Sequence, residues 1–243
     1  MKHLKMIMSV LVLLTIFSCT KKQVEEKGNI SFSLISNVDI AEVTKANVSD
    51  LTALPSSDDF TITIADVSSA QIWSGKVSEW DSSTRITAGD YTVTAVYSSV
   101  EEEGFDKPYF YGTQTFTVTG GQTSAVSVPV SLGNTAILVT CTKNFKDYFK
   151  DYSFKLMRDG SEIVTFVKGE DRAAFIDAYK FNMVGTFQSE TGTLGYEGSY
   201  SSLDEATLYT FVFDVDNTGG ARLTVRFNHD VETVNLEDYE LND

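Results

Sequence analysis

The sequence predicts an all-β protein made of two tandem antiparallel β-sandwich domains, with one short helix in the second domain. Apolar and polar residues alternate along many short stretches, most clearly within Gly89–Thr119. Alternation with period two is typical of strands that place one face on a core. Turn residues separate these stretches, and the pattern starts again after Gly133-Asn134. A chain of 243 residues can form two domains of roughly 100 residues each after removal of a leader.

The first domain is predicted for residues 29–133. Strands are expected at 30–34, 60–64, 91–97, 116–118 and 126–130, with weaker candidates at 70–75 and 84–86 beside the apolar anchors Trp73 and Trp80. Residues 37–58 show no sustained period and are expected to form a long loop. Pro129 has no N–H for a ladder, so its strand is expected to be an edge or to end there.

The second domain is predicted for residues 134–243. Cys141 shares a strand face with Ile137 and Val139, so we expect a buried, small apolar residue here and not a reactive thiol. A short helix is expected where aromatic residues follow Asn144, its predicted N-cap, at Phe145, Tyr148, Phe149 and Tyr152. Later strands are expected at 154–156, 163–167, 179–187, 209–215 and 223–227, with a turn at 216–220. Residues 231–241 are expected to form a last strand or an acidic tail.

The N-terminus has the features of a bacterial lipoprotein signal. Two lysines precede an apolar run from Met6 to Phe17, and Ser18 stands directly before Cys19. We expect residues 1–18 to be removed, Cys19 to be lipidated, and residues 19–28 to act as a tether. The alternative is an ordinary signal peptide with a chance cysteine. With Cys19 lipidated, Cys141 is the only thiol, and no intrachain disulfide can form.

Composition restricts the partners. The chain holds 19 basic and 34 acidic residues, for a net charge of −15. Such a surface disfavours nucleic acid and anionic lipid headgroups, because phosphate binding needs positive charge. The expected partners are outer-membrane lipid through the acyl anchor, and other protein subunits or glycans.

Several segments resemble the DUF4493 family of Bacteroidota lipoproteins. They are Ala88-Gly-Asp-Tyr-Thr-Val-Thr-Ala, Gly104-Phe-Asp-Lys-Pro-Tyr-Phe-Tyr-Gly, Phe116-Thr-Val, Asp59-Phe-Thr-Ile-Thr-Ile, Asn134-Thr and Phe145-Lys-Asp-Tyr-Phe-Lys-Asp-Tyr. The resemblance implies an exported lipoprotein without naming an activity. The layout is also similar to fimbrillin-like surface proteins, which implies sandwich domains of transthyretin or immunoglobulin type. Lys21-Lys22 precede Glu25-Glu26, so display on the cell surface and display on the periplasmic face both stay open.

Candidate catalytic and metal-binding residues are few. His229 stands beside Asp230, but no serine lies in a Gly-x-Ser-x-Gly setting. Asp214–Gly219 resembles the start of a calcium loop, yet the twelfth position is Val225, where a glutamate is needed. The acids Glu101–Glu103 with Asp106 are expected to form a solvated loop; the alternative is that they gather a cation. We therefore expect no enzyme, no cofactor and no metal site.

An aromatic segment is the main candidate for binding. Phe105, Tyr109 and Tyr111 lie beside acids and could stack on sugars or fill a pocket of a partner. The alternative is that Phe110 enters the core in step with Gly112, while Tyr109 and Tyr111 face outward.

Three functional classes follow: a surface adhesin or fimbria-like subunit, a glycan- or nutrient-binding lipoprotein of an uptake system, and an enzyme. The first is expected to act through exposed strand edges at Ile30–Ile35 and Val231–Leu241. Lys45 lies in the loop after the first of these strands, where fimbrillin-like precursors are similar in carrying a basic processing site.

Overall fold

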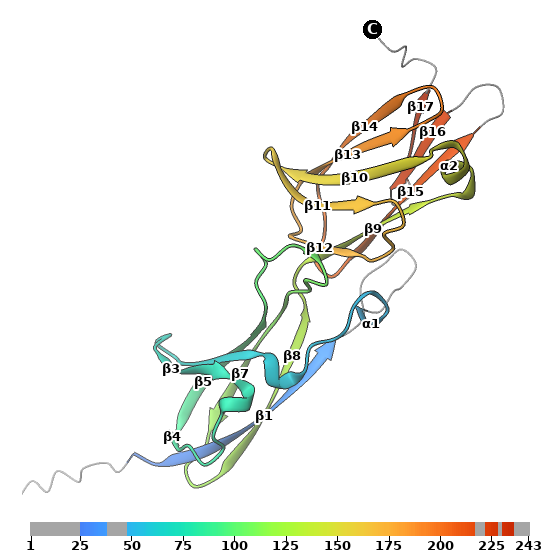
Figure 1. Ribbon diagram of the computed structural model, residues 1–243. Helices are drawn as coiled ribbons and strands as arrows, with labels where there is room; N and C mark the ends of the chain where they lie inside the picture. The colour runs from blue at the N-terminus through green and yellow to red at the C-terminus, as the bar shows by residue number, and fades with distance from the viewer. Residues whose placement is uncertain (1–24, 38–47, 217–221, 228–229, 236–243) are drawn as a thin grey trace, which may run out of the picture.

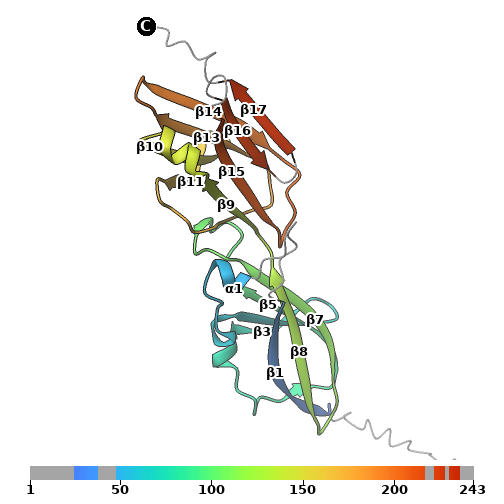
Figure 2. The same ribbon diagram turned by 90° about the vertical axis from the view of Figure 1, so that its right-hand side faces the viewer.

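The computed structural model of the 243-residue chain describes residues 25–37, 48–216, 222–227 and 230–235. Strands dominate these ranges, and the two halves of the chain lie end to end (Figures 1 and 2). The predicted all-β sandwich fold is confirmed. The signal peptide 1–18, Cys19, Lys45, the Gly219 turn, His229 and residues 236–243 lie outside the described residues.

The first half is a seven-stranded sheet in the order β3-β2-β5-β7-β8-β1-β4. Its strands are β1 (Lys27–Asn37), β2 (Thr61–Asp66), β3 (Gln71–Lys76), β4 (Ile86–Thr87), β5 (Gly89–Tyr97), β7 (Phe110–Val118) and β8 (Thr123–Leu132). Trp80, which follows β3, lies with its ring centroid 5.3 Å from that of Phe32 in β1. The sheet therefore folds over on itself, and the first core lies inside the fold.

The second half contains a four-stranded sheet, β11-β10-β13-β14, and a six-stranded sheet, β17-β16-β15-β9-β12-β6. Their strands are β6 (Gly104–Phe105), β9 (Thr135–Cys141), β10 (Asp151–Arg158), β11 (Ser161–Val167), β12 (Ala174–Ile176), β13 (Phe181–Gln188), β14 (Thr193–Tyr200), β15 (Leu208–Asp216), β16 (Arg222–Phe227) and β17 (Asp230–Asn235). Residues 230–235 thus form the last strand that was one of two alternatives for this segment. Tyr179, expected in a strand, lies before β13 and is exposed.

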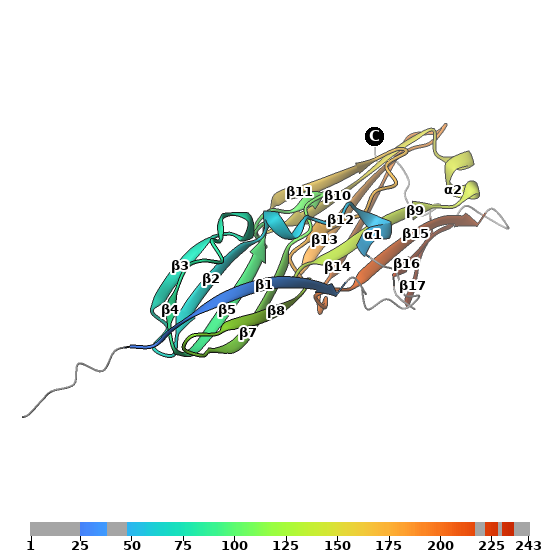
Figure 3. The ribbon, with the colours of Figure 1, turned by 90° about the horizontal axis from the view of Figure 1, so that it is seen from below.

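Each half contains one parallel strand pair, which corrects the expectation of purely antiparallel sheets. β1 runs parallel to β8, from Asn29 opposite Thr123 to Asn37 opposite Ser131. β9 runs parallel to β15. Figure 3 shows β1 following β8 along the first half. Parallel neighbours need a long crossover between them, and here each crossover consists of several intervening strands.

The prediction that the strand with Pro129 is an edge or ends there was wrong, because β8 continues to Leu132. β8 lies between β7 and β1. The β7–β8 ladder pairs Phe110 with Leu132 and Tyr111 with Ser131, and Pro129 lies just beyond it. A Cβ on Gly112 would come 2.0 Å from the Pro129 carbonyl oxygen. The sheet accommodates the proline because the ladder is interrupted there and a glycine faces it.

Two apolar clusters fill the two halves. Aliphatic residues dominate the first cluster, including Ile62, Ile64, Val93 and the inward-facing valines of β8. Aromatic residues dominate the second, where the largest fully buried side chains are Phe145, Phe149, Phe154, Phe166, Phe181, Phe187, Phe211 and Phe213. β12 supplies both clusters, because Phe175 faces the first cluster while Ala174 and Ile176 face the second. The two cores are therefore adjacent at this strand.

The helices are shorter and placed differently from the prediction. α2 (Lys143–Tyr148) is capped by Thr142, whose hydroxyl oxygen accepts from the Phe145 N–H at 3.2 Å, and not by Asn144. Tyr152 belongs to β10. Within the stretch expected to be a loop, α1 (Val48–Leu51) and a 3-10 helix, Ser57–Asp59, form; a second 3-10 helix is Val77–Glu79. No helix in the described part of the chain is long and apolar enough to cross a membrane.

Candidate functional site

The connection between β5 and β7 leaves the first half of the protein and joins the second. Within it, β6 pairs with β12, so that Phe105 lies opposite Ala174 and Gly104 opposite Phe175. Ser98 and Asp106 hold positive φ angles of 65° and 57° on either side of β6. These positions let the chain turn out of the first sheet and back again. The aromatic segment that the sequence singled out is therefore part of the junction between the two halves.

Two acidic residues of this connection, Glu103 and Asp106, bind arginines of the second half, which corrects the expectation of a solvated loop for these two. Glu101 and Glu102 are exposed, as expected. Arg158 Nη1 lies 2.7 Å from both carboxylate oxygens of Glu103, and the Asp177 N–H donates to the same carboxylate at 2.7 Å. The side chain of Glu103 is only 16% exposed and that of Arg158 only 18%. Charge-assisted hydrogen bonds with little solvent around them are stronger than those on an open surface.

A second ion-pair group covers Phe105. Arg172 donates to Asp106 at 2.8 Å and to Glu170 at 2.9 Å. Hydrogen bonds from Arg172 lower the pKa of Glu170 to about 2. The Arg172 guanidinium lies 4.6 Å from the centre of the Phe105 ring, which forms a T-shaped pair with Phe166 at a centroid distance of 5.0 Å. Phe105 is thus half-buried and packed within the junction, so the aromatic residues left to face a ligand are Tyr109 and Tyr111.

Tyr109 and Tyr111 stack on one another at the same junction. Their ring centroids are 6.0 Å apart and their planes differ by 7°. Gly133 lies against them, and a Cβ there would come 2.7 Å from the Tyr109 ring. Tyr109 is half-buried, and this burial raises the pKa of its hydroxyl. Tyr111 is 41% exposed, so it is the member of the pair that a ligand could reach. Phe110 enters the core, as the packing alternative expected.

Asn134 fixes the point where the chain passes from the first half to the second. Its fully buried side chain donates to the Lys107 carbonyl at 3.1 Å and accepts from the Tyr109 N–H at 3.3 Å. Its own carbonyl accepts from the Ala206 N–H at 3.0 Å. Sequence reasoning placed a boundary here but missed this role, because the partners of a polar residue cannot be read from spacing alone. A buried amide needs such partners, since leaving it unpaired costs free energy.

β1 is the second candidate, as an open strand edge. On its outer side only Lys27 and Gly28 are paired, with β4. Asn29 donates its N–H to the Gln122 carbonyl in the direction of β8. Alternate residues of a strand direct their backbone groups to opposite sides, so Ile30, Phe32 and Leu34 direct theirs away from β8. The Ile30 carbonyl accepts from the Trp80 indole N–H at 3.1 Å.

Two further chemical candidates, Asp214 and Cys141, lie within the described residues. Asp214 accepts a hydrogen bond from Thr142, which caps α2. Cys141 is half-buried, and burial raises the pKa of its thiol to about 12, so it is protonated near neutral pH. Within residues 25–37, 48–216, 222–227 and 230–235, no group of three or more His, Cys, Asp and Glu side chains is arranged to hold a metal ion.

Comparison with protein families assigns the chain. The model of DUF4493, a domain of unknown function, matches residues 26–241. The chain belongs to the DUF4493 family. This confirms the resemblance carried by the segments between Asp59 and Tyr152. A comparison of this DUF4493 protein with curated protein sequences finds no match.

Several solved structures are similar to this DUF4493 protein. A Bacteroides ovatus protein proposed to act in cell adhesion matches with a TM-score of 0.50 and 11% identity, over 85% of this chain and 97% of the other. A fimbrial assembly protein from Parabacteroides distasonis matches with a TM-score of 0.49 and 11% identity, over 86% and 98%. The fimbrial anchor protein Mfa2 from Porphyromonas gingivalis matches with a TM-score of 0.40 and 8% identity, over 84% and 98%. At 11% identity, the match to the Bacteroides ovatus protein shows a shared fold and no more.

Proposed function

We propose that this DUF4493 protein is a lipid-anchored protein of the cell envelope that works as a surface adhesin or a fimbria-like subunit, and not as an enzyme. Its interactions use strand edges, with the acyl groups on Cys19 holding it to the outer membrane. The shared fold with the Bacteroides ovatus protein proposed to act in cell adhesion supports this class. We propose residues 29–133 and 134–243 as its two domains.

The observation that carries the proposal is the position of β1. From Asn29 to Asn37 this strand is paired only with β8 among the described strands, and it contributes Ile30, Phe32 and Leu34 to the first core. If β1 leaves, it uncovers an apolar strip along Val126, Val128 and Val130. A strand from another subunit can fill such a strip, because it restores both the backbone ladder and the buried side chains.

The test of assembly uses a Lys-specific protease on the delipidated protein. We expect cleavage after Lys45 to free β1 and to give ordered oligomers. The measurement is the mass of the protein in solution. Lys45→Arg is the matched control, since it keeps the charge and resists this protease. Deleting Val231–Asp243 is expected to abolish the oligomers. Because β17 pairs with β16 inside the monomer, a second variant truncated after Asn235 separates loss of this strand from loss of the tail. Cleaved protein that stays monomeric contradicts the assembly proposal.

The test of the anchor uses Cys19→Ser. We expect this variant to be unprocessed or soluble, while the native protein stays with membranes after an alkaline carbonate wash. Membrane association of Cys19→Ser after that wash contradicts lipidation at this position. Protease treatment of intact cells then decides between surface and periplasmic display.

A second candidate function is glycan or nutrient binding beside an outer-membrane uptake system. The exposed Tyr111, held flat by Tyr109, favours it because flat aromatic rings stack on sugar rings. A glycan-array signal that Tyr111→Ala and Tyr109→Ala abolish supports this function. Tyr179→Ala is the control, since Tyr179 is also exposed but lies in the second half, apart from this pair.

A further inference from the structure

β9 has a backbone edge that its neighbouring strand covers only in part. On one side it pairs with β15 from Ala136 to Cys141. On the other side β12 covers only Thr135–Ile137. Continuing the β12 register backward would bring residues 170–173 beside 138–141. The chain instead turns away at these residues, leaving a gap of four residues, or about 13 Å of strand.

The hydrogen bonds of β9 show which backbone groups face the gap. The Ala136 N–H donates to the Thr207 carbonyl and the Thr142 N–H to the Phe213 carbonyl, both toward β15. In a parallel ladder, alternate residues direct both backbone groups to the same neighbour. Val139 and Cys141 therefore direct their N–H and C=O groups away from β15. No described strand pairs with them on that side.

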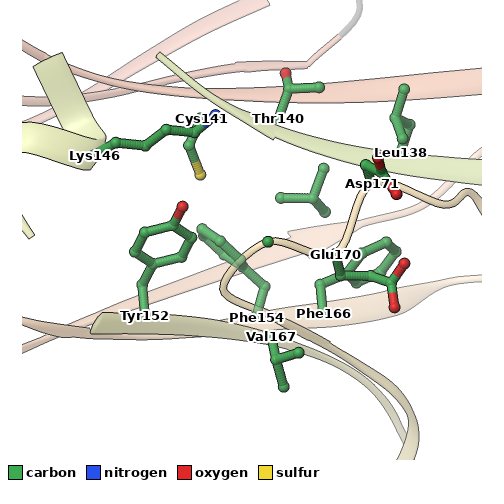
Figure 4. A pocket seen from close by; sticks show the side chains of 12 residues that line it. Leu138, Thr140, Cys141, Lys146, Tyr152, Phe154, Phe166, Val167, Glu170 and Asp171 are labelled. Carbon is green, nitrogen blue, oxygen red and sulfur yellow. The ribbon is translucent and has the colours of Figure 1, made fainter. Parts of the chain in front are cut away.

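A cavity of about 330 Å³ lies beside this edge, between the two sheets of the second half. Figure 4 shows Leu138, Thr140 and Cys141 of β9 on one wall and Tyr152, Phe154 and Phe166 on the other. Phe154 and Phe166 are core residues, so the deep part of the cavity is apolar. The side chain of a strand residue added opposite Val139 would enter this space.

Ion pairs from the first half hold the gap open. Gly169 adopts a φ of +88°, and the Glu170 N–H closes a turn onto the Val167 carbonyl. Arg172 then binds both Glu170 and Asp106 of the β5–β7 connection. These contacts keep residues 170–172 from lying beside β9. The gap is therefore built into the junction and does not depend on β1.

Charge around the cavity favours an acidic ligand at one end. Lys146 lies on the cavity wall and is exposed, and no acidic side chain pairs with it in the described part of the chain. The Lys168 ammonium lies 6.0 Å from the ring centre of Tyr152, another wall residue. Glu170 and Asp171 line the opposite end (Figure 4). These lysines are cations in a chain whose net charge is −15.

We propose that the free edge of β9 binds an extended peptide segment of another protein. The segment pairs with the backbone of Val139 and Cys141, places an apolar side chain against Phe154 and Phe166, and sets an acidic residue beside Lys146. Addition of a strand to an open edge gains main-chain hydrogen bonds, while the pocket for alternate side chains selects the sequence. This site is separate from the β1 edge and needs no cleavage of the chain.

The first test measures amide hydrogen exchange in the full mature chain without acyl groups. We expect the amides of Val139 and Cys141 to exchange at least about 100-fold faster than those of Leu138 and Thr140, which bond to β15. Similar slow exchange at all four positions overturns the free edge.

The second test titrates a synthetic peptide, acetyl-Asp-Thr-Val-Thr-Leu-Thr-Asp-amide, into the same protein. We expect binding that slows exchange at Val139 and Cys141. Two further peptides carry N-methyl groups, one on Val and Leu and the other on the threonines. Only one of these sets faces β9, so one peptide should lose affinity by at least about tenfold, as expected when two backbone hydrogen bonds are lost. Equal affinity of all three peptides overturns strand pairing.

Variants of the protein test the charged end. Lys146→Glu should lower the affinity for the acidic peptide several-fold and raise the affinity for a peptide in which Lys replaces both Asp residues. Lys143→Glu is the matched control, because Lys143 lies on the same helix and already pairs with Asp147. Equal effects of the two variants on peptide affinity contradict the placement of the peptide's acidic residue beside Lys146. Protection at Val139 that appears without peptide and rises with protein concentration would mean that a second copy occupies the edge, which overturns the choice of a different protein.

Discussion

Arg158 illustrates how single residues join distant segments in this protein. It extends from β10 to Glu103, a residue of the connection between two strands of the first half. The pair is mostly buried, whereas Lys155 on the same strand pairs with Glu162 in a site where both side chains are about half exposed. Exposed pairs contribute little because water screens them, while breaking a buried pair leaves a charge without its partner.

We therefore expect Arg158→Ala to lower the free energy of unfolding by about 2–3 kcal/mol, below the cost for a fully buried pair. Lys155→Ala, the matched control, should change it by at most about 0.5 kcal/mol. Urea unfolding of the three proteins measures this difference. Equal values for both variants would show that the Glu103 pair is screened like a surface pair.

Glu170 gives a prediction for acid stability. Hydrogen bonds from Arg172 lower its pKa from 4.5 to about 2. A lowered folded-state pKa means that the stabilisation is present above about pH 5 and is lost as the pH falls toward 2. Glu170→Gln should therefore reduce the fall in Tm between pH 5 and pH 2. Glu197→Gln, which is exposed and outside the described ion pairs, is the control and should keep the native pH profile.

At the scale of secondary structure, α2 shows how one cap sets where a helix begins. Both Thr142 and Asn144 are of cap-forming types, and the aromatic spacing alone favoured Asn144. Thr142 is the cap because its hydroxyl meets the Phe145 N–H and also donates to Asp214 of β15. The contact with β15 comes from a segment about seventy residues later, so local spacing could not distinguish the two positions.

Replacing each candidate cap tests this assignment. We expect Thr142→Ala to cost about 1–2 kcal/mol, because the helix loses its cap and Asp214 loses a donor. Asn144→Ala, inside the helix and exposed, should be neutral or slightly stabilising, since alanine has the higher helix propensity. Thermal unfolding followed by circular dichroism measures both. A larger loss for Asn144→Ala contradicts the observed cap.

At the scale of the whole molecule, the two halves are joined by more than a linker. β6 comes from the connection between β5 and β7 of the first half and is the last strand of the six-stranded sheet in the second half. β12 lies between the two cores. Asn134 binds the connection on one side and Ala206 on the other. Contacts of this kind couple the unfolding of neighbouring units, so we expect one cooperative transition in the native protein.

We expect Asn134→Ala to separate this transition into two in calorimetry, and to allow proteolysis near Gly133, which is buried in the native protein. The reason is that the variant leaves the Lys107 carbonyl and the Tyr109 N–H without their partner. Asn182→Ala is the control, since Asn182 is exposed and binds Ser199 within one sheet. A single unchanged transition in Asn134→Ala would show that β12 and β6 couple the halves without it.

The all-β class, the faces of most strands and the resemblance to the DUF4493 family could be predicted from the amino-acid sequence. Period-two alternation is a local property, and residues such as Ile62, Val93 and Phe213 are buried where it predicts. Three features could be seen only in the folded protein: the parallel pairing of β1 with β8, the interior place of Pro129 and the path of β6 into the other half. Each of these depends on which segment lies alongside, sometimes more than seventy residues away. Glu103 and Asp106 were likewise predicted to be solvated, because the arginines that bind them belong to the other half of the chain.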